Sequence, residues 1–225
     1  MLPLFQTEKT TEGKRPLADV IRPKNIEEIV GQSHILGDQG SLQKLIEKNH
    51  IPSLILWGPP GCGKTTLAKI LAEKSFYQFV TISAVTSGVP ELKKILNIAS
   101  EQFKLGQKTL LLVDEIHRFN RAQQDIFLPY VEDGTIILVG ATTENPSFEL
   151  NSALLSRCKV LVLTRLQQND LQELIKRAEA YYQNQLPITD NAKNILCTLA
   201  DGDGRYLLNM CEEIFSLGLK KTYRY

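Results

Sequence analysis

A string with the residue types of a phosphate-binding loop runs from Gly58 to Thr65 and reads Gly-Pro-Pro-Gly-Cys-Gly-Lys-Thr. It follows the apolar run Leu54–Trp57 and precedes a segment with helical spacing of apolar residues, which is the context that the pattern G-x-x-x-x-G-K-[ST] requires. Glycines allow successive backbone N–H groups to point at phosphate oxygens, and the following helix N-terminus adds partial positive charge. The string therefore predicts a nucleotide-binding site.

The side chains of this string have separate expected roles. The Lys64 ammonium is expected to reach the β- and γ-phosphates of ATP, and the Thr65 hydroxyl to bind Mg²⁺. Thr66 extends the start of the helix, and the Cys62 side chain is not needed for the chemistry. The predicted nucleotide-binding residues of the loop are Gly58, Pro59, Pro60, Gly61, Cys62, Gly63, Lys64, Thr65 and Thr66.

Two adjacent acids, Asp114 and Glu115, follow the continuous apolar run at residues 109–113. The carboxyl ends of strands in a parallel sheet are where ligands bind in open α/β folds, and neighbouring strand residues point to opposite faces. We expect Asp114 to orient Mg²⁺ and Glu115 to polarise the attacking water. A solvated strand end is the alternative for these acids. An acid directly after the metal aspartate favours hydrolysis over a small-molecule kinase.

Strand-like and helix-like segments alternate around these residues. Strands are expected at residues 53–57, 79–82, 109–113, 135–139 and 159–163, and helices at 64–74, 91–103 and 121–131. This alternation predicts an α/β fold with a parallel five-stranded sheet flanked by helices. The expected organisation is a flexible arm at 1–15, an ATPase core at 16–165 and a small all-helical lid of about three helices at 166–225. A further helix is expected over 42–48, before the first strand.

Composition narrows the setting of the protein. The 225 residues carry a net charge of +1, with 43% hydrophobic and 23% charged residues, so bulk charge gives no argument for nucleic acid. Four scattered cysteines without metal-ligand spacing indicate free thiols in a reducing compartment. No apolar run approaches the roughly 18 residues of a membrane span or forms a signal peptide. The protein is expected to be cytoplasmic.

Two further strings are Asp-Glu-Ile-His-Arg-Phe-Asn at 114–120 and Ala-Thr-Thr-Glu-Asn-Pro-Ser at 141–147. Together they resemble the replication-associated recombination protein A family, AAA+ ATPases related to clamp loaders, and both strings are specific to this family among AAA+ proteins. The resemblance covers residues from about 16 to 215. The strings at 153–158 and 202–209 add to it. The resemblance implies the AAA+ form of the P-loop fold, in which the lid follows the ATPase core.

The resemblance also implies roles for single residues. Thr143 matches sensor 1, which contacts the γ-phosphate or the attacking water, with Thr142 as the alternative one position earlier. Arg157 matches the arginine finger that reaches a neighbouring subunit's nucleotide, and Arg205 matches sensor 2. The alternatives are an ordinary surface arginine for Arg157 and a cap or ion pair within the lid for Arg205. The residues implied to cover adenine are Arg22, Pro23, Val30 and Gly31.

His117, inside the first of these strings, is interpreted as a structural neighbour of the two acids rather than as a base. Glu144 and Asn145, inside the second, either contribute to the nucleotide site or shape a turn.

Family members act on DNA at stalled replication forks as homo-oligomers, so the resemblance implies an ATP-hydrolysing enzyme of replication, recombination and repair. Its expected partners are single-stranded, gapped or forked DNA, contacted through phosphates, and possible replication proteins. The sequence ends at Tyr225, before the further helical domains of the family, so oligomer formation is expected to be impaired. The alternatives are a truncated, nucleotide-gated binding module with little turnover, and a clamp-loader or branch-migration ATPase.

Overall fold

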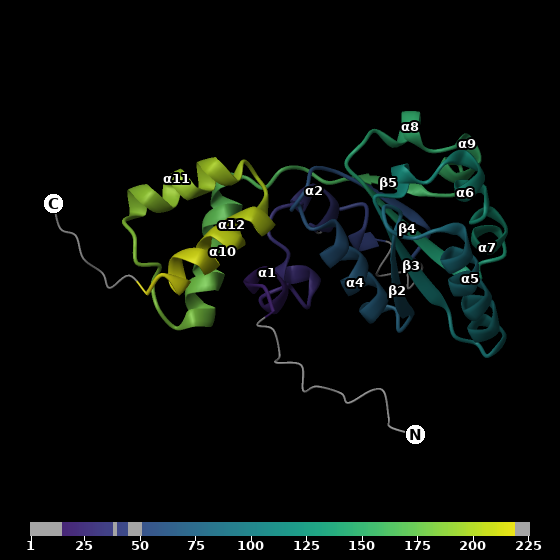
Figure 1. The fold of residues 1–225 in the computed structure, drawn as a ribbon, viewed down its shortest axis with the longest axis horizontal. Helices are drawn as coiled ribbons and strands as arrows, with labels where there is room; N and C mark the ends of the chain where they lie inside the picture. The colour runs from purple at the N-terminus through teal and green to yellow at the C-terminus, as the bar shows by residue number, and fades with distance from the viewer. Residues whose placement is uncertain (1–14, 38–39, 45–50, 219–225) are drawn as a thin grey trace, which may run out of the picture.

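The computed structural model describes residues 15–37, 40–44 and 51–218, which form two lobes joined near their middle (Figure 1). The larger lobe contains a five-stranded parallel sheet in the order β2-β3-β4-β1-β5. The strands are β1 (Leu54–Trp57), β2 (Gln78–Ser83), β3 (Thr109–Asp114), β4 (Ile136–Thr142) and β5 (Lys159–Val162). The predicted fold, a parallel five-stranded sheet flanked by helices and followed by a helical lid, is confirmed.

Two apolar clusters lie on the two faces of the sheet and explain the uninterrupted apolar run of β3. Leu110 and Leu112 pack with α4, while Leu111 and Val113 pack with α5 on the opposite face. Alternate strand residues point to opposite faces, so a strand covered on both sides has no polar positions. The helices of this lobe are α4 (Lys64–Lys74), α5 (Val89–Lys104), α6 (Arg121–Asp125), α7 (Leu128–Glu132), α8 (Pro146–Glu149) and α9 (Ser152–Leu155).

Two elements differ from the expected ranges for local reasons. The single helix expected at 121–131 is divided into α6 and α7, because Pro129 in the first turn of α7 has no N–H to donate to the preceding turn. Strand β4 continues past Val139 to Thr142, through Gly140. A Cβ at Gly140 would lie 2.8 Å from side-chain atoms of both Ile55 and Ile116, so glycine permits this close approach.

The smaller lobe consists of the three lid helices α10 (Gln168–Tyr182), α11 (Asp190–Ala200) and α12 (Gly204–Ser216). Their buried side chains form one cluster. Helix α11 contributes Cys197 and Ala200 to it, whereas the more apolar Ile195 and Leu199 are 52% and 60% exposed. Within the described residues, no helix has the length and apolar character needed to cross a membrane.

The segment before β1 connects the two lobes. It contains α1 (Leu17–Val20), the 3-10 turn η1 (Ile26–Glu28) and α2 (Ser33–Leu36). Leu17 is 1% exposed within the lid cluster, and its backbone N–H donates to Glu212 of α12 at 2.8 Å. The sequence predicts a lid that begins after residue 165, but the core of the lid also contains Leu17 from the N-terminal segment.

The amide of Gln32 joins this segment to the linker between β5 and α10. Its Nε2 donates to the Thr164 carbonyl at 2.8 Å, and its Oε1 accepts from the Thr164 N–H at 2.9 Å. The two chain crossings between the lobes are thus bonded to each other. Residues 1–14 of the predicted arm at 1–15, most of the predicted helix at 42–48 and the last residues of the predicted lid lie outside the described residues.

Candidate nucleotide-binding site

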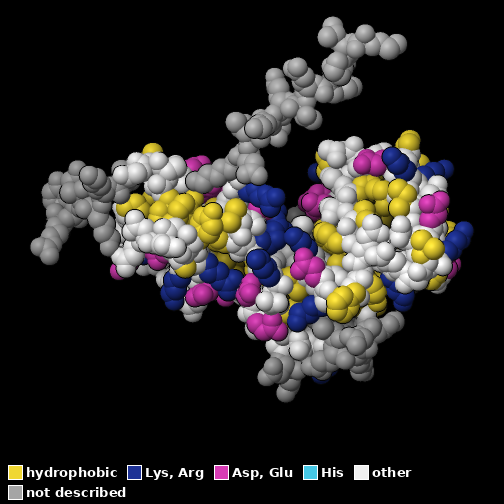
Figure 2. All heavy atoms as spheres, turned by 90° about the horizontal axis from the view of Figure 1, so that it is seen from below, with side chains coloured by type: hydrophobic (Ala, Val, Ile, Leu, Met, Phe, Trp, Pro, Cys, Tyr) yellow, Lys and Arg dark blue, Asp and Glu magenta, His cyan; other side chains and the backbone are white. Residues whose placement is uncertain are grey.

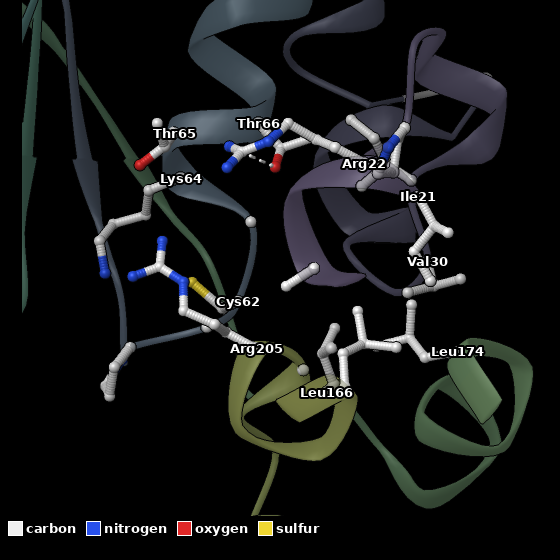
Figure 3. A pocket seen from close by; sticks show the side chains of 18 of the residues that line it. Ile21, Arg22, Val30, Cys62, Lys64, Thr65, Thr66, Leu166, Leu174 and Arg205 are labelled. Carbon is white, nitrogen blue, oxygen red and sulfur yellow. Dashed lines mark hydrogen bonds between the residues drawn. The ribbon is translucent and has the colours of Figure 1, made fainter. Parts of the chain in front are cut away.

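A pocket lies between the two lobes, where Figure 2 shows Lys and Arg side chains gathered. Three parts of the chain line it, and Figure 3 shows many of the side chains. The phosphate loop and the acids contribute residues 60–66, Asp114 and Glu115; the N-terminal segment contributes Ala18, Ile21, Arg22, Pro23, Ile29 and Val30; and the lid and its linker contribute Leu166, Leu174, Gly204, Arg205 and Leu208.

The phosphate loop has the backbone that its glycines predict. Gly61 and Gly63 have φ angles of +65° and +103°, in the region that favours glycine, and α4 begins at Lys64. The Lys64 side chain is 8% exposed, and its Nζ donates to the carbonyls of Gly58 and Pro59 at 2.7 and 2.8 Å. In the part of the chain that the structure describes, no carboxylate lies within ion-pair distance of this ammonium. A buried cation with only neutral partners fits a site for an anionic ligand.

The lid contacts the phosphate loop directly. The Gly204 N–H donates to the Gly61 carbonyl at 3.3 Å, and a Cβ at Gly61 would lie 1.8 Å from Oδ1 of Asp203. Asp203 is the N-cap of α12 and accepts the Tyr206 N–H at 2.9 Å. This cap fixes the first turn of α12, so that Arg205 extends into the pocket on the same side as Lys64 (Figure 3).

The two acids both line the pocket but are separated by a turn rather than by strand alternation. Asp114 ends β3, whereas Glu115 has a left-handed backbone with φ 53° and ψ 44° and precedes the turn η2 (Ile116–Arg118). The Glu115 side chain is 32% exposed and lies beside His117, as expected for a neighbour of the acids. The pocket thus has carboxylates, a hydroxyl at Thr65 and an ammonium facing one space, which is the donor set that Mg²⁺ and phosphates require.

The opposite end of the pocket is mainly apolar. Arg22 and Val30 line this end, and Arg22 Nη1 lies 3.4 Å from the Thr66 hydroxyl while pairing with Asp19. Gly31 does not line the pocket; its φ is +68°, and a Cβ there would lie 3.0 Å from Leu166. Apolar side chains beside a phosphate site fit a base such as adenine. The sequence interpretation missed the lining residues Ala18, Ile21, Ile29, Leu166, Leu174, Gly204 and Leu208.

Arg157 and the two threonines lie outside the pocket lining. Arg157 lies between α9 and β5 and pairs with Glu132 of α7 at 2.5 Å. Thr142 is the fully buried last residue of β4, and Thr143 is half-buried. The segment that leads from the two threonines to α9 is held by Gln124 of α6. The buried amide of Gln124 donates to the Glu149 carbonyl and accepts the Asn151 N–H.

Cys62 belongs both to the loop and to the core of the larger lobe. The residue is 2% exposed. Burial raises the pKa of the thiol, and the nearby Lys64 ammonium partly opposes this effect. At neutral pH the side chain is therefore a protonated, weakly polar group that packs in the core of the larger lobe.

Comparisons with known proteins give a consistent group of relatives. A family model described as the Holliday junction DNA helicase RuvB P-loop domain matches residues 21–168. The chain is 46% identical over 202 residues to replication-associated recombination protein A of Haemophilus influenzae and 45% identical over 203 residues to that of Escherichia coli. These matches cover 88% of the chain but 45% of each relative, so the chain spans about half their length.

Two matches to proteins with other names extend the group. ATPase WRNIP1 of Dictyostelium discoideum is 44% identical over 212 residues, which cover 92% of the chain and 24% of that protein. The solved structure of the Thermotoga maritima RuvB Holliday junction branch migration motor is 27% identical, with a TM-score of 0.72, and the match covers 87% of this chain and 65% of that one. The sheet with its lid is therefore shared well beyond close sequence relatives.

Proposed function

Because the chain belongs to the AAA+ P-loop ATPases, and among them to the replication-associated recombination protein A family, we propose that it binds and hydrolyses ATP to act on DNA during replication, recombination and repair. The observation that carries this proposal is the buried Lys64 ammonium, held on loop carbonyls opposite Asp114 and Glu115. A pocket that brings a phosphate loop, a cation and a carboxylate pair together is suited to phosphoryl transfer to water.

The roles of the residues follow from their places in the pocket. The backbone N–H groups at 61–66 and the Lys64 ammonium hold the phosphates, and Thr65 and Asp114 are the residues that would hold Mg²⁺. When bound there, Mg²⁺ would supply Lewis-acid stabilisation of the charge on the phosphates. Glu115 orients and polarises the attacking water. Arg205 contacts the phosphates from the lid, while Arg22 and Val30 border the adenine end.

Arg157 acts on the nucleotide of a second copy rather than on its own. It lies outside the lining of its own pocket, and its side chain is 37% exposed and paired with Glu132. An arginine in this place can stabilise transition-state charge only in a neighbouring subunit's site. A homo-oligomer is therefore part of the proposal, and DNA contacts are expected to be made with phosphates and to weaken with salt.

A second candidate is a nucleotide-gated binding module with little turnover. The observation that favours it is the ion pair of Arg157 with Glu132, which engages the finger within its own chain. The two candidates differ in concentration dependence. Turnover that rises with protein concentration and with DNA ends supports the motor, whereas tight ATP binding with flat, negligible turnover supports the module.

The pocket is tested by nucleotide binding and phosphate release in two variants. Lys64→Ala is expected to abolish binding of a fluorescent ATP analogue, and Glu115→Gln to keep binding but lose hydrolysis. The matched controls are Lys69→Ala, an exposed lysine on the same helix, and Glu101→Gln, an exposed acid on α5. Unchanged hydrolysis in Glu115→Gln would show that this acid does not activate water.

A further inference from the structure

A small polar cluster adjoins Glu115 and joins it to the end of β4. At its centre is His117, whose side chain is 7% exposed. The Nδ1 atom of this ring lies 2.9 Å from the Thr142 hydroxyl and 3.4 Å from Oε2 of Glu115. One ring nitrogen thus faces both the predicted water-activating acid and the end of the central strand β4.

The protonation of the ring follows from its two neighbours. A carboxylate accepts hydrogen bonds and cannot donate them, so an attractive contact with Glu115 requires the proton on Nδ1. Thr142 Oγ1 can accept this proton too, because its own hydroxyl proton is directed to the Glu144 carbonyl at 3.3 Å, while the Glu144 N–H donates to it at 3.0 Å. The same Nδ1 proton is therefore shared between the carboxylate and the hydroxyl.

This contact matters because the backbone gives Glu115 little restraint of its own. Its left-handed turn places the side chain beyond the end of β3, and among the described residues His117 is the one side chain recorded in contact with its carboxylate. A catalytic base must keep its position closely, since a displacement of about 1 Å costs on the order of 100-fold in rate. A buried ring on a short 3-10 turn is a rigid support for such a group.

We infer that His117 is a positioning residue that holds the Glu115 carboxylate and couples it, through the Thr142 hydroxyl, to the loop at residues 143–151. This inference rests on the proposed ATPase function and deepens it. It makes Thr142, rather than Thr143, the threonine joined to the acid. The coupled loop continues through α8 and α9 to Arg157, so the cluster connects the acid of one pocket with the residue proposed to serve the next.

The test compares isosteric and conservative variants of both partners. Thr142→Val removes the hydroxyl and Thr142→Ser keeps it; His117→Ala removes the ring and His117→Asn returns a donor near the place of Nδ1. Phosphate release is measured in single turnover, with protein in excess of ATP, beside the affinity for a fluorescent ATP analogue. His34→Ala, an exposed histidine on α2, is the matched control.

We expect His117→Ala and Thr142→Val each to lower the rate of hydrolysis by about 10- to 100-fold while ATP affinity changes less than about twofold. The double variant is expected to be no slower than about the worse single variant, because the two residues act as one unit. Thr142→Ser and His117→Asn should recover most of the rate. Additive losses, or losses of affinity at an unchanged rate, would overturn the inference.

A second readout needs no nucleotide. The chain has three histidines, so the ring nitrogens of His117 can be followed by ¹⁵N NMR with the other two as references. Thr142→Val should shift the Nδ1 resonance of His117, and Thr142→Ser should leave it near its original position. An Nδ1 resonance indifferent to Thr142→Val would contradict the hydrogen bond itself.

The inference and the proposed function fail in different ways. If Glu115→Gln hydrolyses ATP normally, the proposed function is wrong and the cluster has no acid to serve. If Glu115→Gln is inactive but folded His117→Ala and Thr142→Val variants hydrolyse within about twofold of the unaltered protein, the inference alone is wrong. Should His117→Ala not fold, Thr142→Val and the NMR readout carry the test by themselves.

Discussion

The contact between the phosphate loop and the lid predicts a specific cost for Gly61→Ala. A left-handed backbone costs an L-residue about 1–2 kcal/mol. The new Cβ would also lie 1.8 Å from Oδ1 and 2.4 Å from Cγ of Asp203, so Asp203 must move and its cap on α12 is lost, which costs about 1 kcal/mol. The sum is about 2–3 kcal/mol, which lowers the unfolding temperature of a chain of this size by roughly 5–10 °C.

A double-mutant cycle separates the collision from the backbone strain. Asp203→Ala alone should cost about 1 kcal/mol for the cap, and the double variant Gly61→Ala/Asp203→Ala should be no less stable than Gly61→Ala. Gly63→Ala is the matched control, because its φ is +103° but no atom lies within 4 Å of its Cβ, so it should show no coupling to Asp203. Thermal and urea unfolding give the free energies. Losses at Gly61 and Asp203 that add to within about 0.5 kcal/mol would refute the reasoning.

Three further predictions concern the finger, the lid arginine and the buried thiols. Arg157→Ala should spare ATP binding and lower turnover only at concentrations where the protein assembles, whereas Glu132→Ala, which frees the finger, should not lower it; phosphate release across a protein dilution series decides. Arg205→Ala should weaken ATP binding by about tenfold or more, the loss of one charged hydrogen bond, as measured by titration with a fluorescent analogue. Burial raises the pKa of Cys158 and of Cys211 to about 12. Both thiols therefore lose their protons at a lower pH in the unfolded state than in the folded state, so the free energy of unfolding should fall as pH rises above about 9. The unfolding temperature of Cys158→Ala should fall less over that range.

The phosphate loop could be predicted from sequence because its requirements are local. The glycines at Gly61 and Gly63, the lysine and the flanking strand and helix all lie within about twenty residues, and the backbone angles agree with what glycine permits. Strand β3 could also be predicted from the sequence, because a strand buried on both faces of a sheet is an uninterrupted apolar run.

The remaining parts of the site depend on contacts that no local pattern records. Leu166, Leu174 and Leu208 have ordinary lid-core spacing, and they border the pocket only because the lid docks on the N-terminal segment. The left-handed turn at Glu115 had no sequence signal, since left-handed residues other than glycine are uncommon and no glycine marks the position. The division of the helix at 121–131 could have been predicted from Pro129 alone.

The two hydrogen bonds between the Gln32 amide and the Thr164 backbone hold together the two chain segments that connect the lobes. Both covalent crossings between the lobes are bonded side by side at this amide. A Cβ at Gly31 would lie 3.0 Å from a side-chain carbon of Leu166, so the two crossings also approach closely here. Any change in the angle between the lobes on nucleotide binding would therefore be centred on this one crossing, and every copy in an assembly would bend at the same place.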